Sequence, residues 1–197
     1  MTESRLDDQS KEILRHLVID VFSASDLMQI NSRNVFYRRT YIRTFFAFAE
    51  GYGVVVRDAL LGLPEALTLA PEKRCILRDQ KFEVGKNGKP EAKEARYPFL
   101  NLLAATLRCW AELKGRTEDE ITKTIFGVDE WNRFQSTLNV RHRLTHPKLD
   151  HGMEVTDDEI ADATIAFEWF LTILADLSDV KIDKEAMEQF VKAQARQ

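Results

Sequence analysis

Residues 33–62 read RNVFYRRTYIRTFFAFAEGYGVVVRDALLG, and this stretch predicts one long helix. Its apolar and small residues recur every three or four positions, the spacing that places side chains on one side of a helix. This stripe consists of Ile42, Phe46, Ala49, Gly53, Val56 and Leu60. Asn31 or Ser32 can cap the start, and Gly62 followed by Pro64 ends the helix. A helix of this length favours a fold built mainly from helices.

Helical patterns also occupy most of the chain on both sides of this stretch. We expect further helices over residues 4–24, 98–114, 117–126, 129–146, 156–179 and 183–195, with a break at about 23–31. The pairs Thr117/Glu120 and Thr156/Glu159 have capping-box spacing, and Asp129 is the expected cap of the helix that it begins. Only 8 glycines and 5 prolines occur in 197 residues, so tight turns are few. The sequence therefore predicts an all-α fold, an antiparallel helical bundle of four to five main helices.

One segment, around residues 76–96, departs from the helical pattern. Asn87-Gly88 lies between KFEVGK and KPEAKEA, and Asn-Gly is the strongest short signal for a hairpin turn. We expect a small polar β-hairpin inserted in the bundle, for partner contact or for trimming an interface. A disordered loop is the alternative, because the second arm is rich in Glu and Lys.

Charge is distributed unevenly along the chain. The total is 28 Lys and Arg against 32 Asp and Glu, a net charge of −4, which argues against non-specific coating of nucleic acid. Residues 31–58 nevertheless carry five arginines against Glu50 and Asp58, a local net of +3. Residues 152–197 carry eleven acids against four basic residues, a local net of −7. A local basic surface that binds a polyanion is therefore compatible with the negative net charge of the protein.

The sequence favours a cytoplasmic location and no membrane contact. No stretch reaches the roughly 18 apolar residues that a membrane helix needs. The first residues, MTESRLDD, lack the apolar core of a signal peptide. Cys75 and Cys109 are far apart in the chain, and we expect them to be reduced thiols.

The segment NVRHRLTHPK, residues 139–148, is the richest in chemistry. Its basic side chains are Arg141, His142, Arg143, His146 and Lys148. The predicted helix has an apolar stripe of Trp131, Phe134 and Leu138, and the next positions of that stripe are Arg141 or His142. A guanidinium buried there is costly unless it is paired or lines a cleft. A purely structural interpretation is also open. Cations suit a helix C-terminus, and Arg141 can pair with a carboxylate of the acidic C-terminal region.

A metal site is not expected in this segment. His142 and His146 are four residues apart, as in a zinc-binding HExxH helix, but Arg143 stands where that motif has its glutamate. No cysteine lies nearby, and clustered cations repel a divalent ion. We therefore expect neither a metal nor another cofactor.

The sequence RHRLTH, residues 141–146, resembles the signature of the HEPN (higher eukaryotes and prokaryotes nucleotide-binding) superfamily. That signature is an arginine, four to six residues and a histidine, usually with a polar residue directly after the arginine. The placement before Pro147 and the basic, aromatic helix upstream are also similar to HEPN proteins. The resemblance implies one HEPN-like domain over residues 1–197, with its core at about 33–180 and a C-terminal helix at 183–197. Such domains are usually dimeric, with the two motifs meeting in a shared cleft.

The resemblance also implies an activity. Many HEPN proteins are metal-independent RNA endonucleases of toxin–antitoxin, phage-defence or RNA-processing systems, whereas others are non-catalytic binding modules. By this pattern Arg141 and His146 are the catalytic pair and His142 is a supporting polar residue. The chemistry is sensible, because a histidine can move a proton near neutral pH and an arginine can bind the phosphate. Attack by the ribose 2′-OH restricts the substrate to RNA.

Further basic residues are candidates for RNA binding. Arg143 and Lys148 flank the motif, and Arg38, Arg39 and Arg43 belong to the long helix. Glu50 interrupts an apolar stretch and is expected either to pair with Arg141 or to lie near the cleft. The aromatic residues between the arginines are Phe36, Tyr37, Tyr41 and Phe45. We expect these rings to pack in the core, as well as Trp110, Trp131 and Trp169, although stacking on RNA bases is the alternative.

Three functions remain open at this point. The first is a dimeric HEPN-type endoribonuclease, acting as a toxin or defence effector with a cognate antitoxin or other protein partner. The second is a non-catalytic HEPN-like module that binds RNA, a nucleotide or a protein. The third is a helical interaction protein in which the motif is accidental.

Overall fold

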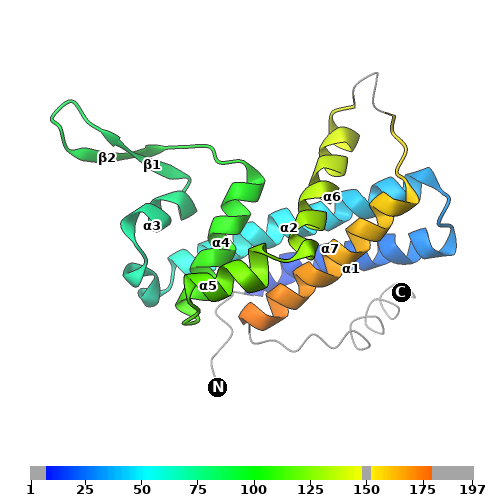
Figure 1. The fold of residues 1–197 in the computed structure, drawn as a ribbon, viewed down its shortest axis with the longest axis horizontal. Coiled ribbons are helices and arrows are strands. Elements are labelled where there is room, and N and C mark those ends of the chain that lie inside the picture. Colours follow the sequence, from blue (N-terminus) through cyan, green and yellow to red (C-terminus); the bar gives the residue numbers. More distant parts are fainter. Residues whose placement is uncertain (1–7, 148–151, 179–197) are drawn as a thin grey trace.

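The protein is mostly helical, with one small two-stranded sheet (Figure 1). The structure is a computed structural model and describes residues 8–147 and 152–178. Its helices are α1 (Asp8–Ile30), α2 (Val35–Leu61), α3 (Pro71–Leu77), α4 (Phe99–Leu113), α5 (Glu118–Ile121), α6 (Asp129–Thr145) and α7 (Asp157–Ser178). A short 3-10 helix η1 (Pro64–Thr68) follows α2, and a π-helical turn η2 (Thr122–Phe126) follows α5. The predicted helical fold with a hairpin is confirmed, whereas the predicted helix over 183–195 lies outside the described residues.

Helix α2 is the long helix that the sequence predicts. Its cap is Asn34, whose side chain accepts hydrogen bonds from the backbone N–H groups of Phe36 (2.9 Å) and Tyr37 (3.4 Å). The predicted caps Asn31 and Ser32 are therefore wrong, because both precede the residue at which the chain turns into the helix. The helix ends before Gly62, as predicted.

Helix α1 is longer than predicted and runs through the expected break at 23–31. Ala24 and Met28 continue the apolar phase of Val21, and all three are buried. Packing against α2 thus outweighs the weak helix propensity of the serines and aspartate in this segment. The two helices run antiparallel, with the α1–α2 turn at one end of the molecule (Figure 1).

Aromatic rings fill the centre of the core. Phe45 lies 5.6 Å from Phe134, 5.4 Å from Phe167 and 6.4 Å from Phe170, measured between ring centroids, so α2, α6 and α7 meet at this residue. Tyr41, Trp131 and Trp169 are also buried, and Trp110 is half-buried against Tyr52. These rings are core residues, as predicted.

The predicted β-hairpin is present as β1 (Gln80–Val84) and β2 (Pro90–Glu94), paired antiparallel. Gly88 in its turn has a φ of 75°, a backbone conformation that glycine adopts easily. The hairpin stands out from the helices beside α3 (Figure 1). On one face Glu83 forms ion pairs with Lys81 and Lys93, and these pairs lower the pKa of its carboxyl to about 2.

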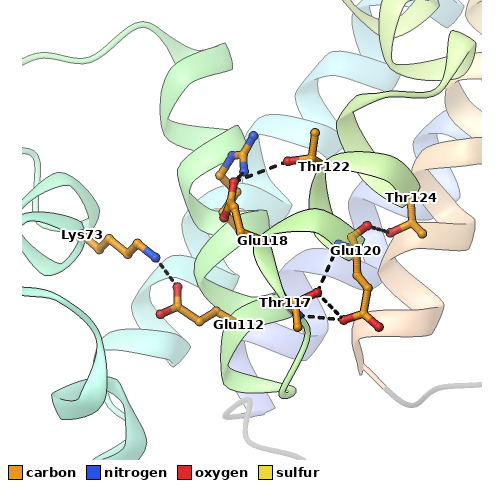
Figure 2. Close-up of polar contacts among 8 residues, drawn as sticks. Lys73, Glu112, Thr117, Glu118, Glu120, Thr122 and Thr124 are labelled. Atoms are coloured by element: carbon orange, nitrogen blue, oxygen red, sulfur yellow. Dashed lines mark hydrogen bonds and ion pairs between the residues drawn. The ribbon is translucent and has the colours of Figure 1, made fainter.

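Local hydrogen bonds explain where the later helices begin. Figure 2 shows the capping box of α5, in which the Glu120 carboxylate accepts from the Thr117 backbone N–H at 2.8 Å. The predicted box at the start of α7 is also present, since the Thr156 N–H donates to Glu159 at 3.0 Å. Asp129 is not a cap. Val128 holds the cap position of α6 without a side-chain hydrogen bond, and Asp129 is the first helical residue.

Candidate functional site

The candidate site lies at the C-terminal end of α6, where Arg141, His142, Arg143 and His146 follow one another. The helix ends at Thr145, and His146 leaves the helical region with φ −125° and ψ 67°, since the proline that follows disfavours helical geometry there. The backbone N–H of His146 still donates to the carbonyl of His142 at 2.9 Å. Both histidine side chains are exposed. The end of the helix therefore presents two imidazoles to solvent in a fixed backbone frame.

Arg141 is held from the side by Glu50 of α2. Its Nη2 lies 2.7 Å from Oε1 of Glu50, and the two side chains are 24% and 37% exposed. This is the pairing that the interruption of the apolar stretch by Glu50 suggested. The contact engages one nitrogen of the guanidinium fork, which has five N–H donors in all. The structure thus brings a partly exposed, oriented cation to the last turns of α6.

A second contact from α2 fixes the end of α6. Nη2 of Arg43 donates to the backbone carbonyl of Leu144 at 2.7 Å. The last carbonyls of a helix have no partner within the helix, so a cation there supplies a hydrogen bond and a favourable charge. Arg43 was predicted to bind RNA, and in the structure this nitrogen positions the candidate site.

Two other predicted RNA-binding arginines have partners within the fold. Nη2 of Arg143 lies 2.8 and 2.9 Å from the two carboxylate oxygens of Glu159 on α7. The Arg38 side chain is only 13% exposed, and its guanidinium donates to the Val155 carbonyl at 2.8 Å and to the Asp157 carboxylate. These pairs fasten α6 and α2 to the start of α7. Their charges are largely balanced, which limits what they offer to a phosphate.

The remaining predicted binding residue of α2 is Arg39, which is half-buried. Within residues 8–147 and 152–178 its side chain forms no hydrogen bond or ion pair, so its charge is available to a ligand. Lys148 lies outside the described residues. Phe36 corrects the prediction for the aromatic residues, because it is 61% exposed instead of buried in the core. Its position nine residues before buried Phe45, two and a half helical turns, was the signal that could have shown this.

A pocket of about 360 Å³ opens between α6 and α7, on the side of α6 that carries Arg143. It is lined by Ser136, Thr137, Asn139, Val140, Arg143, Glu159 and Asp162. Neither Arg141 nor His146 lines it, so this pocket is separate from the predicted catalytic pair. Among the described residues no group of three or more His, Cys, Asp or Glu side chains is placed to hold a metal ion. No helix in the described ranges is long and apolar enough to cross a membrane.

No model of a known protein family, no curated protein and no solved structure matches this chain.

Proposed function

We propose that the protein is a metal-independent endoribonuclease of HEPN type, working as a homodimer whose two α6 ends form one cleft. The observation that supports this is the placement of Arg141, held by Glu50 at 2.7 Å, five residues before the exposed His146 at the same helix end. A permanent cation and a titratable ring are the two groups that phosphodiester cleavage without metal requires.

The reaction follows from these two groups. The ribose 2′-oxygen attacks phosphorus and loses its proton to a base, while the bond from phosphorus to the 5′-oxygen breaks and an acid protonates that oxygen. The products are a 2′,3′-cyclic phosphate and a 5′-hydroxyl. In the dimer, His146 of one protomer is the base and the same residue of its partner is the acid. Arg141 neutralises the charge on the pentacoordinate phosphorus, and His142 supports it as a polar neighbour.

The test is cleavage of single-stranded RNA by the purified protein in the presence of EDTA. We expect products with cyclic-phosphate ends, and a loss on the order of a hundredfold or more in rate for Arg141→Ala and for His146→Ala. Exposed His16 on α1 and exposed Arg78 at the end of α3 provide matched controls, since His16→Ala and Arg78→Ala should cleave normally. Equal cleavage by a folded Arg141→Ala/His146→Ala double variant and the wild type would refute the assignment.

A second function has one observation in its favour. Arg38, Arg43 and Arg143 all have partners within the chain, which leaves less free positive charge beside the motif than the sequence predicts. This favours a non-catalytic HEPN-like module that binds RNA, a nucleotide or a protein. For the nuclease, the biological setting that we propose is a cytoplasmic toxin or defence effector with a cognate antitoxin or another protein partner. Binding of RNA without any cleavage in EDTA or in Mg²⁺ would select this second function.

A further inference from the structure

The first turn of α2 presents an aromatic ring to solvent. Phe36 is 61% exposed, and its ring makes an edge contact with neighbouring Tyr37 at 5.8 Å between centroids. Single exposed apolar residues are ordinary on protein surfaces and need no function. Phe36 differs from such residues in its position relative to the end of α6.

Toward the C-terminal end of α6, its contacts with α2 shift toward the N-terminal end of α2. Arg141 meets Glu50, and three residues later the carbonyl of Leu144 meets Arg43. His146 follows two residues on, a rise of roughly 3 Å in helical terms. Continued past Leu144, this line of contacts runs toward the first turn of α2, where Phe36 is the second residue of the helix.

Phe36, Arg39 and Arg43 occupy positions i, i+3 and i+7 and therefore lie along one side of α2. Phe36 precedes Arg43 by seven residues, about 10 Å along the helix axis. About three nucleotides cover that length at the roughly 3.4 Å per nucleotide of a stacked strand. An RNA strand with its scissile phosphate at Arg141 and His146 would thus bring a nearby base to Phe36.

The charges around Phe36 suit such a strand. Arg38 is neutralised by Asp157, but Arg39 and the exposed Arg33 form no ion pair within the described residues. Unpaired cations beside an exposed aromatic ring are the combination with which proteins bind single-stranded nucleic acid, the cations on phosphates and the ring on a base.

We infer that Phe36 is a stacking platform for a nucleobase a few nucleotides from the cleaved bond. Arg39 binds a phosphate of the RNA backbone between that base and the cleaved bond. The inference rests on the proposed function, because it takes the phosphate position from Arg141 and His146. It goes beyond that function because it assigns a residue that positions the substrate. Any of the four bases can stack on the Phe36 ring, since every base has a π face. Binding there is therefore tolerant of sequence.

The test uses a probe that the proposed nuclease cannot cut. A fluorescent single-stranded DNA oligonucleotide lacks the 2′-hydroxyl but keeps its bases and phosphates, and its binding is followed by anisotropy. We expect Phe36→Leu to weaken binding on the order of tenfold, whereas Phe36→Trp retains it. The new tryptophan should be quenched when the oligonucleotide binds. Phe82→Leu on β1, where the ring is 45% exposed, is the matched control and should bind like the wild type.

The role of Arg39 is tested by the salt dependence of oligonucleotide binding. Arg39→Gln should make the negative slope of log K against log salt shallower by about 0.7, the value for one phosphate contact on a single strand. A merely structural role of Arg39 would leave that slope unchanged.

The outcomes separate this inference from the nuclease. The inference is overturned if Phe36→Leu binds the oligonucleotide as tightly as the wild type does, or if the wild type does not bind it. Either result counts even if the protein cleaves RNA. A change of oligomeric mass in Phe36→Leu also overturns it, because the ring would then be a protein contact. Conversely, binding of DNA that depends on Phe36, together with absence of RNA cleavage, supports base stacking on Phe36 but removes the nuclease and with it the placement of the platform beside a cleaved bond.

Discussion

The ion pair between Glu50 and Arg141 predicts a measurable coupling between two helices. Glu50→Gln keeps the shape and an acceptor oxygen but removes the charge opposite Arg141, whose side chain is 24% exposed. Fully exposed pairs contribute about 0.2–1 kcal/mol, and hydrogen bonds to charged groups about 1.5–3 kcal/mol. Because Glu50 is 37% exposed, solvent screens the pair, and we expect a coupling free energy of about 1.5 kcal/mol.

A double-mutant cycle measures this coupling. The four proteins are the wild type, Glu50→Gln, Arg141→Gln and the double variant, unfolded in urea and followed by circular dichroism. With a urea m-value of about 2.5 kcal/mol/M, Glu50→Gln should lower the midpoint by about 0.6 M. The coupling should shrink at high salt, as expected for a partly exposed pair. RNA cleavage by Glu50→Gln should fall about tenfold, since the cation remains but its position is less defined.

The pair formed by Lys73 and Glu112, drawn in Figure 2, is the matched control. Its side chains are 40% and 38% exposed and join α3 to α4, away from the end of α6. Its cycle should give a coupling below about 1 kcal/mol and no change in cleavage. A Glu50–Arg141 coupling indistinguishable from zero, with wild-type cleavage by Glu50→Gln, would show that Glu50 does not hold Arg141.

Two further predictions concern the fold. Thr117→Ala removes the hydroxyl of the α5 capping box and should lower the free energy of unfolding, measured in urea, by about 1 kcal/mol. RNA cleavage should stay unchanged. An unchanged urea midpoint would contradict the role of the capping box. Burial, which outweighs a hydrogen bond to Thr164, raises the pKa of Tyr41 from 10.0 to about 12. Between these values the unfolded chain loses a proton that the folded chain keeps, so stability falls as pH rises above about 10. Tyr41→Phe should reduce this alkaline loss, and an identical pH profile in urea unfolding would refute it.

Local patterns were sufficient to predict much of the fold. The three-to-four spacing of apolar residues predicted α2, and Asn87-Gly88 predicted the hairpin. Both signals act within a few residues, where propensity and turn geometry dominate. The extension of α1 to Ile30 was missed because Ala24 and Met28 are held in place by packing against another helix, and no local signal records that packing.

The candidate site was predictable in its members and less so in their contacts. The sequence indicated the cluster at the end of α6 and the pairing of Glu50 with Arg141. It did not indicate that Arg38 reaches Val155 or that Arg43 reaches Leu144, partners more than a hundred positions away in the chain. A surplus of arginine counted along a sequence therefore overstates the charge that a folded surface presents, since tertiary contacts neutralise part of it.

The closure of the hairpin has a practical consequence for protein engineering. Its two ends meet where the backbone N–H of Ala95 donates to the carbonyl of Asp79 at 2.7 Å. The two strands thus begin and end at nearly one point, ahead of the segment 95–98 that leads to α4, and residues 80–94 form a module that a short linker can replace. The same point can accept an epitope tag or a fluorescent reporter without lengthening any path through the helices.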